Sequence, residues 1–322
     1  MSPTGVIQIA FDRYLLSSTV TRQSIVLLDG SNKPVSIDLA PNIVYDPVAR
    51  TATLTRPKTG TWLTPGQPYK IAFTIPQNDD DPNGLRSIDY ATLDPNGTRE
   101  IAFFVDSADG GTGAAPAGVI EGEPTDISFC MDVLPIFASK CSAPTCHGSG
   151  NKPAMSLILD TSEGVSHTAI GRIAQGSNTG ARADQPTSGG RVFGVDMPII
   201  NVDTSASPPV GDPGNSWLVY KLEMAPTPKA DAGQRIIACP GATDAPSQKT
   251  PYSPIAPAHL DADDFERSNL ANLVTGREMP YPVAGGQVYG DAPLTLQERE
   301  TIRMWIQRGA HVEQCGGCAA TQ

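Results

Sequence analysis

Two cysteines and an adjoining histidine are the residues of this chain best suited to carry chemistry. Cys141 and Cys146 are separated by four residues, and His147 follows the second cysteine directly. Two thiols followed by a histidine are typical of covalent haem attachment, in which each thiol adds across a vinyl group and the imidazole binds the iron. The usual spacing between the cysteines is two residues, so a disulfide beside an unrelated histidine stays open as an alternative.

A haem iron that transfers electrons needs a second axial ligand, and a methionine thioether raises its potential relative to a second imidazole. Met279 is followed directly by Pro280, and Pro282 lies two residues further on. Two prolines stiffen this loop, which lowers the entropic cost of holding the sulfur at one place. We therefore expect Met279 as the distal ligand, with Met197, which also precedes a proline, as its rival.

Four further cysteines remain as disulfide candidates: Cys130, Cys239, Cys315 and Cys318. An even remainder fits two disulfides in an oxidising compartment, although six cysteines in three disulfides without haem fit the count equally well. Cys130 lies just upstream of the expected haem helix and is a candidate to pair with Cys239 or with the C-terminal pair. Cys315 and Cys318 could instead close a small loop of their own.

The composition is compatible with an exported protein. The chain has 322 residues, a net charge of −11 and no apolar run long enough to span a membrane. An acidic surface argues against nucleic-acid binding, which depends on Lys and Arg contacts to phosphates. The first residues lack the features of a signal peptide, so the protein is either cytosolic or lost a signal or lipoprotein anchor before Met1. The cysteines favour the second interpretation, with a periplasmic or cell-surface location in a bacterium.

Two kinds of periodicity predict two domains. Residues 1–106 contain about seven short alternating segments separated by turns, which predicts an all-β sandwich. A Gly- and Ala-rich linker is expected over 107–120, and 121–322 is expected to be an all-α, loop-rich domain. Its expected helices are 133–141, 161–170, 217–222, 261–275 and 295–308.

The last expected helix has the clearest start. Thr295 and Glu298 have the spacing of a capping box, in which each side chain bonds the other residue's backbone N–H. Ile302, Trp305 and Ile306 then lie on one face of the helix. Asp160 or Thr161 is the expected cap of the helix that begins near 161.

The N-terminal half resembles the bacterial Ig-like modules of exported surface proteins. The resemblance is carried by an opening Ile-x-Ile-x-Phe-Asp segment from Ile7, a Ser-Ile-Val-Leu segment from Ser24 and a Leu-Thr-Pro-Gly-x-x-Tyr segment from Leu63 to Tyr69. It implies an Ig-like sandwich that serves as a spacer or docking module.

The second half resembles the single-haem cytochrome c domains of large exported bacterial proteins, including the planctomycete-type group, over roughly 125–311. The residues that carry the resemblance are, in order, His147-Gly148, Leu157-x-Leu-Asp160, Gly211-Asp-Pro-x-x-Ser216-x-Leu218-x-Tyr220, Met279-Pro280 and Leu294-Thr-x-x-Glu298-x-x-x-Ile302-x-x-Trp305-Ile306-x-x-Gly309-Ala310. It implies that Cys141 and Cys146 attach one haem c, with His147 as the proximal ligand and Met279 as the distal one. Trp305 would pack near the macrocycle or against the first helix.

The resemblance implies an electron carrier without enzymatic activity of its own. Its partner would be a redox protein in the envelope or at the cell surface, or further copies of itself. Two alternatives stay open: a haem-free structural or adhesive protein with a disulfide-stapled domain, and an electron-donating accessory of an envelope enzyme.

An Asp-rich turn offers a second, separate site. Asp79 and Asp81 lie in the run Asn-Asp-Asp-Asp-Pro-Asn-Gly from Asn78 to Gly84. Carboxylate and carbonyl oxygens in such a run are ligands suited to Ca²⁺, although a solvated turn is the commoner reason for this composition.

Overall fold

The chain forms two units, each with its own core. The structure is a computed structural model that describes residues 5–57, 62–78, 81, 83–106, 127–143, 146–150, 152–177, 193–226, 263–280, 282–283, 287–288 and 294–315. One unit comprises Met1–Asp46 and Arg50–Thr125, and the other comprises Pro47–Ala49 and Asp126–Gln322. In the described part of the chain, no helix is both long and apolar enough to cross a membrane.

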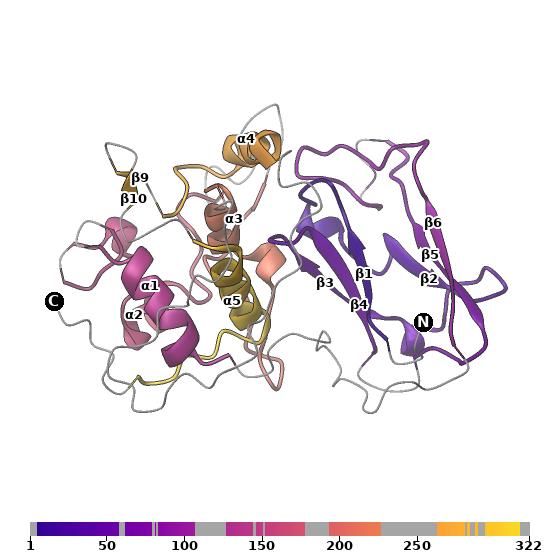
Figure 1. Cartoon of the computed structure of the whole chain (residues 1–322), viewed down its shortest axis with the longest axis horizontal. Coiled ribbons are helices and arrows are strands. Elements are labelled where there is room, and N and C mark those ends of the chain that lie inside the picture. Colours follow the sequence, from indigo (N-terminus) through magenta and orange to yellow (C-terminus); the bar gives the residue numbers. More distant parts are fainter. Residues whose placement is uncertain are drawn as a thin grey trace. The chain divides into compact units, whose positions relative to one another are not determined.

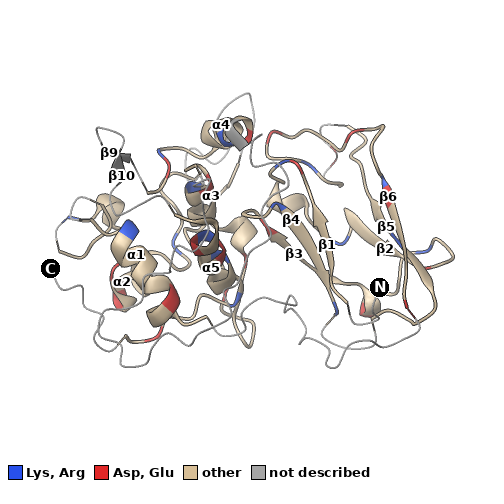
Figure 2. Ribbon diagram, in the orientation of Figure 1, with Lys and Arg blue, Asp and Glu red and all other residues tan. Residues whose placement is uncertain are grey.

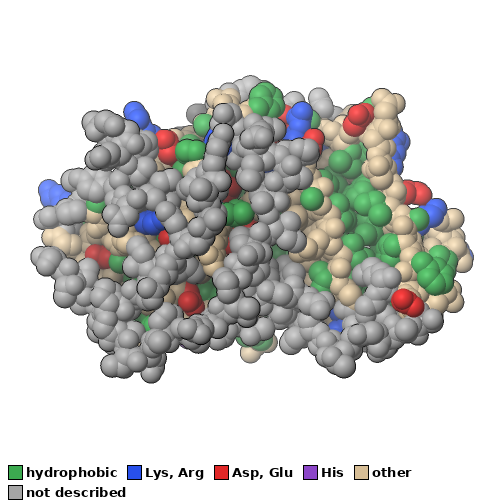
Figure 3. Space-filling model, viewed as in Figure 1, with side chains coloured by type: hydrophobic (Ala, Val, Ile, Leu, Met, Phe, Trp, Pro, Cys, Tyr) green, Lys and Arg blue, Asp and Glu red, His purple; other side chains and the backbone are tan. Residues whose placement is uncertain are grey.

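The N-terminal unit contains two three-stranded antiparallel sheets (Figure 1). In the first sheet the strand order is β1 (Ile7–Ala10), β4 (Thr51–Thr55), β3 (Asn42–Asp46). In the second sheet the order is β2 (Ile25–Leu28), β5 (Pro68–Phe73), β6 (Glu100–Phe104). Its core includes Ile9, Leu27, Leu54, Trp62 and Ile71. Hydrophobic side chains also gather on the visible face of this unit (Figure 3).

The expected all-β Ig-like sandwich is not what the N-terminal unit shows. Its two small sheets are accompanied by 3₁₀ turns η1 (Ser17–Thr19) and η2 (Ile37–Leu39), and η2 lies within one of the alternating segments of the sequence, 35–39. Only an isolated bridge joins Leu28 to Pro34 there. Val35 N–H donates to the Leu27 carbonyl beside this bridge, and the chain then turns into η2, so the pairing with β2 does not continue as a strand.

The C-terminal unit has five α-helices in its described residues. These are α1 (Leu134–Lys140), α2 (Ser162–Thr168), α3 (Trp217–Glu223), α4 (Asp263–Leu273) and α5 (Leu296–Gln307). A π-helical turn, η3 (Phe129–Val133), leads directly into α1, and Pro135 lies in the first turn of α1, where a missing N–H costs nothing. Short 3₁₀ turns η4 (Ala154–Ser156) and η6 (Pro213–Asn215) lie between the helices.

The expectation that this unit is all-α is wrong. Two antiparallel pairs occur in it, β7 (Val202–Asp203) with β8 (Val210–Gly211) and β9 (Pro282–Val283) with β10 (Gln287–Val288). The loop after α2 also pairs with a later loop, because Gly171 N–H donates to the Ile200 carbonyl and Ile199 N–H donates to the Arg172 carbonyl. Buried backbone groups need partners, and the loop segments between these helices find them in one another. The fold is therefore mixed α/β with small antiparallel sheets.

One apolar cluster joins η3, α1, α2, α3 and α5. Its buried members include Phe129, Phe137, Val165, Leu218, Leu222, Ile302, Trp305 and Ile306. Trp305 lies against the first helical segment, with ring centroids 5.4 Å from Phe129 and 6.1 Å from Phe137. Its indole N–H donates to the carbonyl of His311, so its single polar atom is satisfied inside the core.

Two helix starts expected from the sequence are confirmed. The Thr295 side chain accepts from Glu298 N–H while the Glu298 carboxylate accepts from Thr295 N–H, which is the full capping box of α5. Thr161, one of two candidates, caps α2 by accepting from Gly164 N–H.

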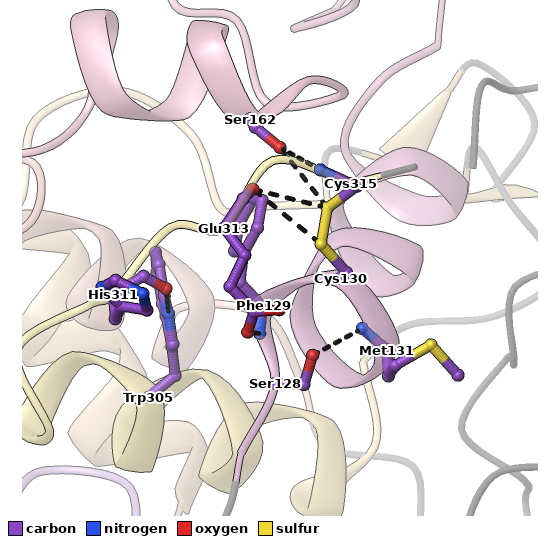
Figure 4. The surroundings of a disulfide bond; sticks show 9 residues. All are labelled: Ser128, Phe129, Cys130, Met131, Ser162, Trp305, His311, Glu313 and Cys315. Atoms are coloured by element: carbon purple, nitrogen blue, oxygen red, sulfur yellow. Dashed lines mark hydrogen bonds between the residues drawn. A yellow bond between two sulfur atoms is a disulfide. The ribbon is translucent and has the colours of Figure 1, made fainter. Parts of the chain in front are cut away.

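A disulfide between Cys130 and Cys315 ties the start of the first helical segment to the chain beyond α5 (Figure 4). The Ser162 hydroxyl donates to Cys315 Sγ at 3.4 Å, so α2 contacts the same bridge. The bond resolves the alternatives for Cys130, and it excludes a small Cys315–Cys318 loop. Cys239 and Cys318 lie outside the described residues.

The Cys130–Cys315 bond closes a loop of 185 residues, which strongly restricts the unfolded chain. Replacing both cysteines with alanine should lower the free energy of unfolding of the C-terminal unit by about 2–5 kcal/mol. Chemical denaturation followed by tryptophan fluorescence measures this loss. Non-reducing peptide mapping should recover one peptide pair that joins the two cysteines, and recovery of Cys130 linked to Cys141 or Cys146 would contradict the assignment.

Candidate functional site

The loop that carries Cys141, Cys146 and His147 starts at the end of α1. Cys141 N–H donates to the Phe137 carbonyl at 2.9 Å and so continues the helix by one residue. His147 N–H donates back to the Cys141 carbonyl at 3.1 Å, and Leu159 N–H donates to the His147 carbonyl at 2.8 Å. The backbone N–H and carbonyl of His147 are therefore both hydrogen-bonded, which fixes the position of its backbone and thus of the side chain's attachment point.

Cys146 is held in the same way. Its N–H donates to the Ala143 carbonyl at 2.8 Å, and its own carbonyl accepts from Ala154 N–H at 2.7 Å. The second cysteine and the histidine therefore sit on a backbone that is bonded on both sides.

Asp160 fastens the turn that follows the histidine. One carboxylate oxygen accepts from the backbone N–H of Ser149 at 2.8 Å and from its hydroxyl at 2.9 Å. Gly148 approaches so closely that a Cβ there would lie 2.6 Å from the Ser142 carbonyl oxygen. Only glycine fits this approach without a shift of the backbone.

The two cysteines in the loop are thiols, in contrast to the disulfide-bonded Cys130 and Cys315. Cys141 is buried and belongs to the apolar cluster. Burial, and next the neighbouring Cys146, raise the pKa of Cys141 to about 12, so its sulfur is held as the neutral thiol. A neutral thiol in apolar surroundings is suited to lie against an apolar ligand.

His147 is 7% exposed, and its Nδ1 is buried without a hydrogen-bond partner in the described residues. Burial lowers the pKa of His147, while hydrogen bonding to the backbone of Ala154 and Leu157 acts in the opposite direction and raises it. The ring is therefore held neutral, which is the form that ligates metals. Thr55 Oγ1 and Trp62 Nε1 are also buried without a hydrogen-bond partner among the described residues, so such an atom does not by itself indicate a ligand. An unbonded nitrogen of a neutral imidazole is, however, chemically suited to bind iron.

These observations fit a haem. Two thiols and a neutral imidazole lie in one loop, next to an apolar cluster. Among the described residues, no group of three or more His, Cys, Asp or Glu side chains is placed to hold a metal ion. A haem iron needs no such group, because the porphyrin supplies most of its ligands.

Met279 and Met197 lie in different surroundings. Met279 packs against the same apolar cluster as Cys141, and its N–H donates to the Lys221 carbonyl of α3 at 2.9 Å. The peptide bond from Met279 to Pro280 is cis. Met197 is 2% exposed and lies beside Gly194, close to the ring of Trp217. The structure thus places Met279, and not Met197, at the cluster that contains Cys141.

The Asp81 carboxylate is used within its own turn, where it accepts from Gln77 N–H and Asn83 N–H, each at 2.9 Å. These two hydrogen bonds lower the pKa of Asp81. The Arg86 guanidinium donates to the carbonyl of Asn78 at 2.6 Å. A positively charged side chain therefore already bonds one of the oxygens that could ligate Ca²⁺. Asp79 and the linker 107–120 lie outside the described residues, and calcium stays a prediction.

A buried ion pair beside the thiol was not foreseen from the sequence. Lys140 Nζ lies 2.8 Å from a Glu298 carboxylate oxygen, and the two side chains are 5% and 4% exposed. Charges of both signs on α3 and α5 can be followed in Figure 2. The capping-box spacing predicted the first role of Glu298, but no local pattern links it to a lysine 158 residues away. Asp160 and Lys221 likewise act through partners that spacing does not reveal.

Comparisons with known proteins found no match for this chain among protein-family models, curated proteins or solved structures.

Replacing Lys140 with methionine should lower the free energy of unfolding of the C-terminal unit by about 3–5 kcal/mol, because Glu298 would stay buried without its cation. Chemical denaturation measures the loss. Lys152 is exposed in the same unit, so Lys152→Met is the matched control and should change stability by less than about 0.5 kcal/mol. Equal effects of the two substitutions would show that the buried ion pair is not a structural tie.

Proposed function

We propose that this protein carries one covalently attached c-type haem and transfers single electrons. Cys141 and Cys146 form the thioether bonds, His147 is the proximal ligand and Met279 is the distal ligand. The observation that carries the proposal is the pair of free thiols in one loop with a buried histidine whose Nδ1 has no hydrogen-bond partner among the described residues.

The disulfide supports this assignment of the cysteines. Cys130 and Cys315 are bonded to each other, whereas the other two cysteines among the described residues, Cys141 and Cys146, are free. Cys141 and Cys146 carry no disulfide in this structure, so both thiols are available for thioether bonds to a haem. An oxidising compartment outside the cytoplasm suits both the disulfide and haem attachment.

The residues of the chain have distinct tasks in this proposal. A bound haem supplies the one-electron redox couple, and the protein supplies ligands, burial and orientation. The bonds of Cys146 and His147 to the backbone fix the attachment loop, and Asp160 holds the turn after it. The apolar cluster around Cys141 and Met279 excludes water from one side of the site.

The N-terminal unit has a different task. Its sheets contain none of the six cysteines and none of the proposed ligands. We assign it a role as a spacer or docking module that presents the haem-carrying unit to a redox partner in the envelope, at the cell surface or in another copy of the chain.

Haem attachment is tested by expression with a haem c maturation system and extraction with acidified acetone. The wild-type protein should keep its Soret absorption after extraction, because thioether bonds are covalent. Cys141→Ser and Cys146→Ser should each keep haem through one thioether, whereas the double variant should lose it.

A matched control is the Cys130→Ser/Cys315→Ser variant, which removes two cysteines outside the loop and should keep its haem. A wild-type protein left colourless after extraction would overturn the proposal and favour the haem-free structural alternative.

A further inference from the structure

Lys221 lies in the last turn of α3, in contact with the loop that carries Met279. The residue is 8% exposed, and every residue of α3 is buried. A lysine is seldom buried unless its ammonium group has partners, so its surroundings indicate what it does.

Two atoms of Lys221 hold two ends of the same short segment. Its backbone carbonyl accepts from Met279 N–H at 2.9 Å. Its Nζ donates to the carbonyl of Thr275 at 3.1 Å. One residue of α3 therefore fastens the segment 275–279 at its first and last positions.

The segment is shaped to receive the ammonium group. Gly276 has a φ of +89°, a conformation that other residues seldom adopt, and a Cβ there would lie 3.2 Å from Lys221 Nζ. The charge of Glu278 also acts on Lys221. The Thr275 hydroxyl donates to the Gly176 carbonyl, which ties the start of the segment to a second loop.

We propose that Lys221 is a positioning residue that holds Met279 in place for iron ligation, a role that rests on the function proposed above. The side chain fixes the start of the loop while the backbone carbonyl fixes its end. The methionine sulfur then needs little further ordering when it binds. Lys221 itself is not a ligand in this account.

The first test uses the haem-free chain and does not depend on the proposed function. Lys221→Met keeps the apolar stem and removes the ammonium group. Amide hydrogen exchange over 275–279 should accelerate about tenfold, because one partly buried hydrogen bond that orders the loop is lost. Exchange in α5 should stay unchanged, which shows that the variant is folded. Lys221→Arg should restore slow exchange, and Lys152→Met should have no effect. Unchanged exchange in Lys221→Met would overturn the proposal.

The second test uses the haem-loaded protein. Wild type should show the long-wavelength absorption band of methionine-ligated ferric haem, and Met279→Ala should lack it. Lys221→Met should keep its covalent haem yet lose most of this band, and Lys221→Arg should recover it. An intact band in Lys221→Met would overturn the positioning role. Wild-type protein with haem but without the band would refute Met279 as the ligand, and with it this role of Lys221, whatever the exchange rates.

Discussion

The buried ion pair between Lys140 and Glu298 is the contact on which the arrangement of the C-terminal unit depends. Glu298 accepts from Thr295 N–H to start α5 and from Lys140 Nζ to hold the end of α1. Cys141 follows Lys140 directly, so the position of the attachment loop is set at this point. Two charges out of water are tolerated because each has a charged partner, and losing either one leaves the other unpaired.

From this fixed start, the loop is shaped by backbone bonds more than by side chains. Cys146 and His147 each use both their N–H and their carbonyl group, and the disulfide at Cys130 holds the preceding turn to the far end of the unit. Three reactive groups of the loop make no hydrogen bond or disulfide among the described residues: the two thiols and one imidazole nitrogen. The proposed haem would use all three.

Local signals in the sequence predicted local structure well. The capping box at Thr295 and the cap at Thr161 depend only on residues a few positions apart, and both are present. The expectation of an all-β half was wrong because 3₁₀ turns accompany its two small sheets. The expectation of an all-α half was wrong because loop segments such as 171–174 and 197–200 pair with each other in a way that periodicity does not encode. The partner of Lys140 was hidden for the same reason, since tertiary contacts are not written in spacing.

The central claim is a covalent haem on one short loop, and mass spectrometry of a tryptic digest tests it most directly. Lys152 precedes Pro153 and resists cleavage, so the digest should yield one peptide from Cys141 to Arg172 that contains both thiols. We expect this peptide to carry the added mass of one haem, and to lose that mass when both cysteines are replaced by serine. The same peptide recovered only with free thiols, or with a Cys141–Cys146 disulfide, from protein matured alongside haem would contradict it.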